Sequence, residues 1–132
     1  MQVAAAIIKD DRDRILICRR GEGGSCAWLW EFPGGKCEAH ESLAECVARE
    51  CAEELSIDIE VQDVYCRTEY SYDDRHIEFT FFTARIISGV PTLSVHRDFA
   101  WVSGEELKGY TFCPADVDVV KRLQKQEIGH SE

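Results

Sequence analysis

The apolar residues of the chain fall into periodic segments separated by polar turns. From Leu43 to Leu55 an apolar residue recurs every fourth position, which predicts a helix with one buried face. Ser42 and Glu45 have the spacing of a capping box, so this helix should begin at Leu43. A second amphipathic helix is predicted over residues 115–126, with Val117 on its inward face.

Short β-branched and aromatic runs bounded by turn residues predict the strands. The predicted strands cover residues 3–8, 14–18, 28–32, 59–70, 77–87 and 99–102. The first two flank the polar residues 9–13 and are expected to pair as a hairpin. We find no repeat and no linker. The order therefore predicts an α+β fold, an α/β/α sandwich with a central mixed β-sheet and two main helices.

The length of 132 residues is that of one domain, which we assign to residues 1–128, with 129–132 as a disordered tail. The net charge of −10 argues against direct nucleic acid binding. The first residues lack the basic region of a signal peptide, and no apolar stretch reaches membrane-spanning length. A cytoplasmic location without membrane contact is expected.

The seven cysteines form an odd set without a CxxC pair. Most of them lie in apolar-periodic segments, which favours reduced cysteines in the core over disulfides or a zinc site.

The predicted first helix carries a dense group of acidic residues. Glu50, Glu53 and Glu54 are spaced i, i+3, i+4, so their carboxylates project from one face. Their mutual repulsion would be relieved by a divalent cation, and Mg²⁺ is held by a few carboxylates together with water and phosphate oxygens. The alternative is an acidic surface helix. The turn before it ends in Gly34-Gly35, which lets the backbone approach a ligand closely.

The spacing G-x5-E-x7-R-E-U-x-E-E-x-G-U, where U is a bulky apolar residue, resembles the signature of the Nudix hydrolases. The matching residues are Gly35, Glu41, Arg49, Glu50, Glu53, Glu54 and Ile57. Cys51 occupies the first U position, and Ser56 stands where the signature has glycine. A left-handed residue other than glycine costs ~1 kcal/mol, so we expect lower stability at Ser56 without loss of the chemistry.

Further segments resemble the MutT branch of this family, and together they cover nearly the whole chain. They are residues 19–20, 31–36, 74–77, 101–103 and 114–116. The resemblance implies a small monomer or weak dimer that hydrolyses a nucleoside triphosphate to the monophosphate and pyrophosphate. The substrate it implies is 8-oxo-dGTP. The alternatives are CTP, dCTP or 5-methyl-dCTP, or a nucleotide-sensing domain without catalysis.

The resemblance also implies roles for individual residues. The implied metal ion is Mg²⁺, with Mn²⁺ as its substitute. Its implied ligands are the Gly35 carbonyl, Glu50, Glu53 and Glu54. Glu50 is the first candidate for the group that activates water, and Glu53 is the second. Arg49 is expected to orient a glutamate, and Glu41 to be a structural partner within the motif.

The nucleotide-binding residues that the resemblance implies are Arg20, Phe32, Lys36, Tyr72, Arg75 and Asp116. The alternatives are a solvated side chain for each cation, a plain core position for Phe32 and a helix N-cap for Asp116. An ionised aspartate only accepts hydrogen bonds, which suits an exocyclic amine of cytosine or guanine. Relatives often have another glutamate where this chain has Val95, so His96 or Asp98 replaces it or the helix carboxylates suffice.

Overall fold

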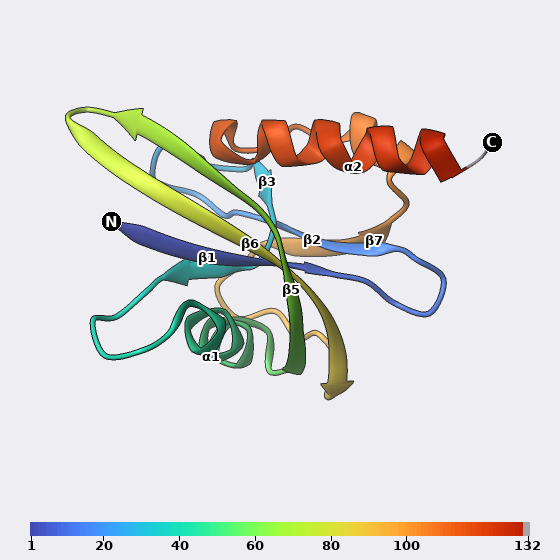
Figure 1. The fold of residues 1–132 in the computed structure, drawn as a ribbon, viewed down its shortest axis with the longest axis horizontal. Coiled ribbons are helices and arrows are strands. Elements are labelled where there is room, and N and C mark those ends of the chain that lie inside the picture. The colour runs from blue at the N-terminus through green and yellow to red at the C-terminus, as the bar shows by residue number, and fades with distance from the viewer. Residues whose placement is uncertain (131–132) are drawn as a thin grey trace.

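The chain folds into a β-sheet layer between two helices, shown in Figure 1 with α1 on one side and α2 on the other. The computed structural model describes residues 1–130, with the side chains of residues 72 and 127–130 outside the description. The helices are α1 (Leu43–Leu55) and α2 (Val117–His130), and two short 3-10 helices are η1 (Glu105–Gly109) and η2 (Pro114–Asp116). This arrangement confirms the predicted α+β sandwich.

The strands form two sheets. The larger has the order β4 (Gly34–Lys36), β1 (Gln2–Ile8), β6 (Arg75–Ser88), β5 (Asp58–Tyr72). The smaller has the order β3 (Trp30–Glu31), β2 (Ile15–Arg19), β7 (Asp98–Val102). The larger sheet is mixed, because β1 runs parallel to β6 and antiparallel to β4.

Strand β1 is buried on both faces, which explains its unbroken apolar sequence. Ala4, Ala6 and Ile8 belong to the core cluster beneath α1, which also contains Val47 and Leu55. The alternate residues of β1 belong to the second cluster, beneath α2. The two helices therefore cover opposite faces of the same strand.

The predicted ends of α1 are confirmed. The Ser42 hydroxyl accepts the Glu45 backbone N–H, and the Glu45 carboxylate accepts the Ser42 N–H, which completes the capping box. The helix ends at Ser56 in the left-handed conformation, with φ 58° and ψ 37°. The predicted strain at this position is therefore present in the fold.

Other boundaries differ from the predictions. Strands β1 and β2 lie in different sheets and meet at the isolated Lys9–Ile15 bridge, so the expected hairpin is wrong. The strand predicted at 28–32 is β3 alone, because Trp28 has a positive φ of 67° and belongs to a turn. The tail expected at 129–132 begins inside α2, which runs to His130, and residues 131–132 lie outside the described residues. Val117, expected on the inward face of this helix, is 37% exposed at its first position, so that expectation is wrong. No helix among the described residues is long and apolar enough to cross a bilayer.

Candidate active site

A cavity of about 550 Å³ opens where β1, β3, β4, the second half of α1 and η2 meet. The tips of β5 and β6 contribute its rim. The predicted site residues that line it are Arg20, Phe32, Gly35, Lys36, Glu50, Glu54, Arg75 and Asp116. The fold therefore brings together residues that are up to 96 positions apart in the sequence. Their spacing and periodicity along the chain do not predict this proximity.

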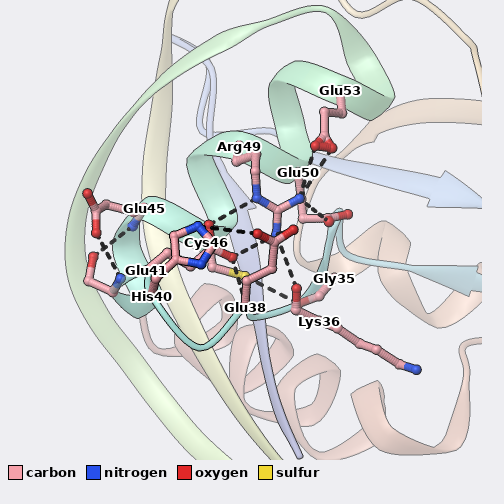
Figure 2. A network of polar contacts seen from close by, with 11 residues as sticks. Gly35, Lys36, Glu38, His40, Glu41, Glu45, Cys46, Arg49, Glu50 and Glu53 are labelled. Atoms are coloured by element: carbon pink, nitrogen blue, oxygen red, sulfur yellow. Dashed lines mark hydrogen bonds and ion pairs between the residues drawn. The ribbon is translucent and has the colours of Figure 1, made fainter.

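Arg49 lies beside this cavity and connects the acidic residues of the motif (Figure 2). Its Nε and Nη2 donate to the two carboxylate oxygens of Glu41, at 3.0 and 2.7 Å. Its Nη1 donates to Glu50 at 2.8 Å and to Glu53 at 3.0 Å. A single guanidinium therefore fixes the positions of three carboxylates, as expected for an arginine that orients glutamates.

Glu41 anchors this arginine to the loop that precedes α1. Its carboxylate also accepts the backbone N–H of Glu38 at 2.9 Å. The hydrogen bonds from Arg49 lower the pKa of Glu41 to about 2, and the same contacts raise the pKa of Arg49. Glu41 thus has the contacts of the structural partner that the motif implied.

Glu50 lies directly against the glycine turn. A Cβ atom at Gly35 would collide with the Glu50 carboxylate, so a side chain at this position would displace Glu50. The Gly35 carbonyl accepts a hydrogen bond from the Cys46 thiol at 3.5 Å. The turn therefore holds a backbone carbonyl and a carboxylate, two oxygen ligands of the type that Mg²⁺ prefers, next to each other.

Glu54 is the second α1 carboxylate in the cavity. Its Oε1 is buried and has no hydrogen-bond partner within the described part of the chain. Burial raises the pKa of Glu54 to about 7. A buried carboxylate oxygen without a donor is costly unless a cation compensates it, so the residues present fit a divalent metal ion.

Glu53 is placed differently from its two neighbours. Its side chain is 55% exposed and contacts Arg49, and Glu53 is not among the residues that line the cavity. A compact group of three ligand-type side chains, with atoms within 4.8 Å of one another, occurs instead at Glu69, His76 and Glu78 on β5 and β6. In the chain as far as it is described, the α1 carboxylates form no such group.

One nucleotide-binding candidate, Arg20, belongs to a chain of polar contacts that the sequence did not reveal. Glu31 lies between Arg20 and His96, with its Oε1 3.2 Å from Arg20 Nη1 and its Oε2 2.9 Å from His96 Nε2. The His96 side chain is only 3% exposed. Val95 itself is 61% exposed, and Asp98 is exposed and accepts the N–H of Phe99. Of the two residues expected to replace the family glutamate, His96 is therefore the one inside the protein.

Phe32 and Asp116 form the apolar and polar walls of the same part of the cavity. Phe32 stacks on Phe112 with ring centroids 5.4 Å apart, so it belongs to the core and to the cavity wall. Asp116 is 6% exposed, and its carboxyl accepts the backbone N–H of Phe32. Burial raises the pKa of Asp116 well above its usual value. These contacts direct the carboxyl into the cavity.

Three candidates have weaker support from contacts. Lys36 and Arg75 are exposed residues at the rim of the cavity, and Lys36 extends away from the network in Figure 2. The side chain of Tyr72 lies outside those described, so its role stays a prediction. A signal for Glu31 exists in the sequence, because it is an acidic residue in a short apolar strand before the glycine turn.

Comparison with known proteins identifies relatives along the whole chain. Residues 3–122 match the NUDIX domain. The chain is 32% identical to an 8-oxo-dGTP diphosphatase of Escherichia coli strain K12, over 95% of this chain and 97% of the relative. It is also 32% identical to a CTP pyrophosphohydrolase of the same strain, over 92% of this chain and 89% of the relative.

Solved structures agree with this similarity. The MutT protein from Methanosarcina mazei Go1 superposes with a TM-score of 0.85 at 28% identity, covering 96% of this chain and 94% of that one. The solution structure of the E. coli ORF135 protein superposes with a TM-score of 0.79 at 32% identity, covering 91% and 85% of the two chains.

Proposed function

Because the chain belongs to the Nudix hydrolase family, we propose that it is a magnesium-dependent nucleoside triphosphate pyrophosphohydrolase, which releases the monophosphate and pyrophosphate. The observation that carries the proposal is one cavity with two chemically distinct ends. Glu50, Glu54 and the Gly35 backbone form an oxygen-rich end, and Phe32 and Asp116 form an end suited to a base.

Gly35, Glu50, Glu54 and, after reorientation, Glu53 would hold the divalent ion. The ion supplies neutralisation of phosphate charge and orientation of the attacking water. Mg²⁺ is the expected ion because the ligand atoms are all oxygens, and Mn²⁺ is the expected substitute.

Glu50 is the residue we propose to orient and deprotonate the attacking water. It lines the cavity, and Arg49 fixes its carboxylate at 2.8 Å. Glu53 is the second candidate, because it is held by the same guanidinium but lies at the exposed side. Arg49 thereby acts as a positioning residue that holds both carboxylates in place.

The nucleotide would lie with its base against Phe32 and Asp116 and its phosphates toward α1. Arg20, which Glu31 holds at the cavity wall, and the rim cations Lys36 and Arg75 would offset the charge of the phosphates. The partner is therefore a small molecule. The proposed oligomeric state is a monomer or weak dimer.

The proposed preferred substrate is 8-oxo-dGTP, the substrate in the name of the E. coli relative. Cytidine triphosphates are the second candidate, because another relative at the same identity is named a CTP pyrophosphohydrolase. The buried Asp116 fits both. Its carboxyl oxygens can accept hydrogen bonds from the N4 amine of cytosine or from N1–H and N2–H of a guanine.

The experiment is a pyrophosphate-release assay with Mg²⁺ on 8-oxo-dGTP, dGTP, CTP, dCTP and 5-methyl-dCTP. We expect 8-oxo-dGTP to have the highest kcat/KM, and Glu50→Gln to lower kcat by roughly a thousandfold. Glu105→Gln is the matched control, because Glu105 is an exposed acid paired with Lys108 away from the cavity. Tight nucleotide binding without product would instead indicate a sensing domain.

A further inference from the structure

Two cysteines from distant parts of the chain face each other in the wall of the cavity. Cys26 lies in the turn that follows the glycine-rich residues 21–24, and Cys113 lies immediately before η2. Both line the cavity, and the interaction between the two thiols adds to burial in raising the pKa of Cys113. The sequence alone does not predict this contact, because the two cysteines lie far apart along the chain.

The backbone holds both residues in place. The Cys26 carbonyl accepts the N–H of Leu29 at 3.1 Å, and the N–H of Cys113 donates to the Trp30 carbonyl at 2.9 Å. The loop that carries Cys26 is fixed further by Arg19, whose Nε donates to the Trp28 carbonyl at 2.9 Å. These backbone hydrogen bonds therefore hold the two cysteines in fixed positions next to each other.

The two thiols differ in accessibility. Cys113 is 5% exposed, and burial raises the pKa of its thiol, whereas Cys26 is half-buried at the mouth of the turn. An oxidant that enters the cavity therefore reaches Cys26 first. Cys113 is then the thiol held close enough to attack the oxidised sulfur.

We propose that Cys26 and Cys113 are a modification site, which peroxides convert to a reversible disulfide that closes the cavity to nucleotide. The Cys26 thiolate attacks a peroxide oxygen and becomes a sulfenic acid, while hydroxide leaves. The Cys113 sulfur then attacks the Cys26 sulfur. The S–S bond forms, the S–O bond breaks, and the departing hydroxide takes the thiol proton as water.

The disulfide changes the cavity because it draws its two walls together. An S–S bond is about 2.05 Å long, which is much shorter than a contact between two thiols. Cys113 is joined through its carbonyl to the N–H of Asp116 at 2.9 Å, so a shift of Cys113 is passed to the base-binding end. Arg20 lines the same cavity as both cysteines.

A second pair of thiols provides an internal comparison. The thiols of Cys37 and Cys46 also interact, which adds to burial in raising the pKa of Cys46. Cys46 belongs to the core beneath α1, however, and neither residue lines the cavity. Oxidation there has a different expected consequence, because Cys46 donates to the Gly35 carbonyl. Peptide mapping distinguishes a Cys26–Cys113 disulfide from a Cys37–Cys46 disulfide, because the two link different peptides.

The test treats the full-length protein, Cys26→Ser and Cys37→Ser with hydrogen peroxide, followed by non-reducing peptide mapping. Wild type and Cys37→Ser should yield a peptide that joins positions 26 and 113 and is two hydrogen atoms lighter. In these two proteins the Kd of a non-hydrolysable nucleoside triphosphate should rise about tenfold or more and recover with dithiothreitol. Cys26→Ser should show neither change.

Two results would overturn the proposal. The first is oxidation of Cys26 to the sulfinic acid without any link to Cys113. The second is a complete 26–113 link that leaves the Kd unchanged. The peptide map and the Kd do not depend on turnover. A failure to release pyrophosphate would therefore contradict the proposed function, while these two measurements would still test the disulfide.

Discussion

Arg49 shows how one side chain organises a charged site. Its five N–H groups are distributed over Glu41, Glu50, Glu53 and the Lys36 carbonyl, and these bonds use geometry as well as charge. Without the guanidinium, the acidic residues of α1 would repel one another and point into solvent. The positions of the Glu50 and Glu53 carboxylates are thus a consequence of their hydrogen bonds to this arginine.

Arg49→Lys should lower kcat by roughly ten- to a hundredfold, because an ammonium cannot donate in parallel to Glu41 and still reach Glu50. The measurement is kcat and KM on the preferred triphosphate, with the near-UV spectrum as a check of folding. Arg85→Lys is the matched control, since Arg85 pairs with Glu60 at 2.8 Å on the surface. Equal effects of the two substitutions would contradict the positioning role.

The Glu41 carboxylate should make stability depend on pH in the acid range. Its pKa falls from 4.5 in the unfolded chain to about 2 in the folded one. A lowered pKa stabilises the fold above pH 4.5, and this stability is lost as the pH falls toward 2. The thermal midpoint of wild type should therefore fall more steeply over this range than that of Glu41→Gln. Parallel curves for the two proteins would disprove the linkage.

At the scale of elements, the sequence was most informative where the signal was local. The capping box and apolar stripe of α1 depend on residues within four positions, and both were predicted correctly. The three acidic residues were expected on one face, but only Glu50 and Glu54 line the cavity and Glu53 is exposed beside Arg49. Strand β4 was missed because Gly34 and Gly35 have low strand propensity, and pairing with β1 overrides it. The separation of β1 and β2 into two sheets is likewise a tertiary effect.

Ser56→Gly should stabilise the protein by ~1 kcal/mol, because glycine adopts the left-handed conformation without the steric cost of a Cβ. Chemical denaturation of the two proteins under the same conditions measures the difference. Ser71→Gly, in the extended strand β5, is the control and should lose stability. A gain at both positions would show that the conformation of Ser56 is not the cause.

At the scale of the molecule, the site exists because the fold brings together segments that are far apart. His96 and Glu31 are 65 residues apart, and Asp116 reaches the cavity from the segment before α2. The motif residues could be predicted because they are carried by one helix and its turn. The Glu31–His96 contact and the Cys26–Cys113 pair could not, because they depend on how separate segments pack.

Metal binding should be visible as stability of the whole domain. Mg²⁺ binds the folded state, so it should raise the thermal midpoint of wild type in a concentration-dependent way. Glu54→Gln should be more stable than wild type in EDTA, since a neutral amide avoids the burial of a charge, and should gain less from Mg²⁺. An equal response of both proteins to Mg²⁺ would place the ion elsewhere, with the Glu69–His76–Glu78 group as the next candidate.

The most direct test of the whole account is product analysis after incubation of 8-oxo-dGTP with the protein and Mg²⁺, with and without EDTA. A magnesium-dependent pyrophosphohydrolase should form 8-oxo-dGMP and pyrophosphate in equal amounts, with no product in EDTA and almost none from Glu50→Gln. Release of a nucleoside diphosphate and inorganic phosphate, or turnover that survives both EDTA and Glu50→Gln, would contradict it.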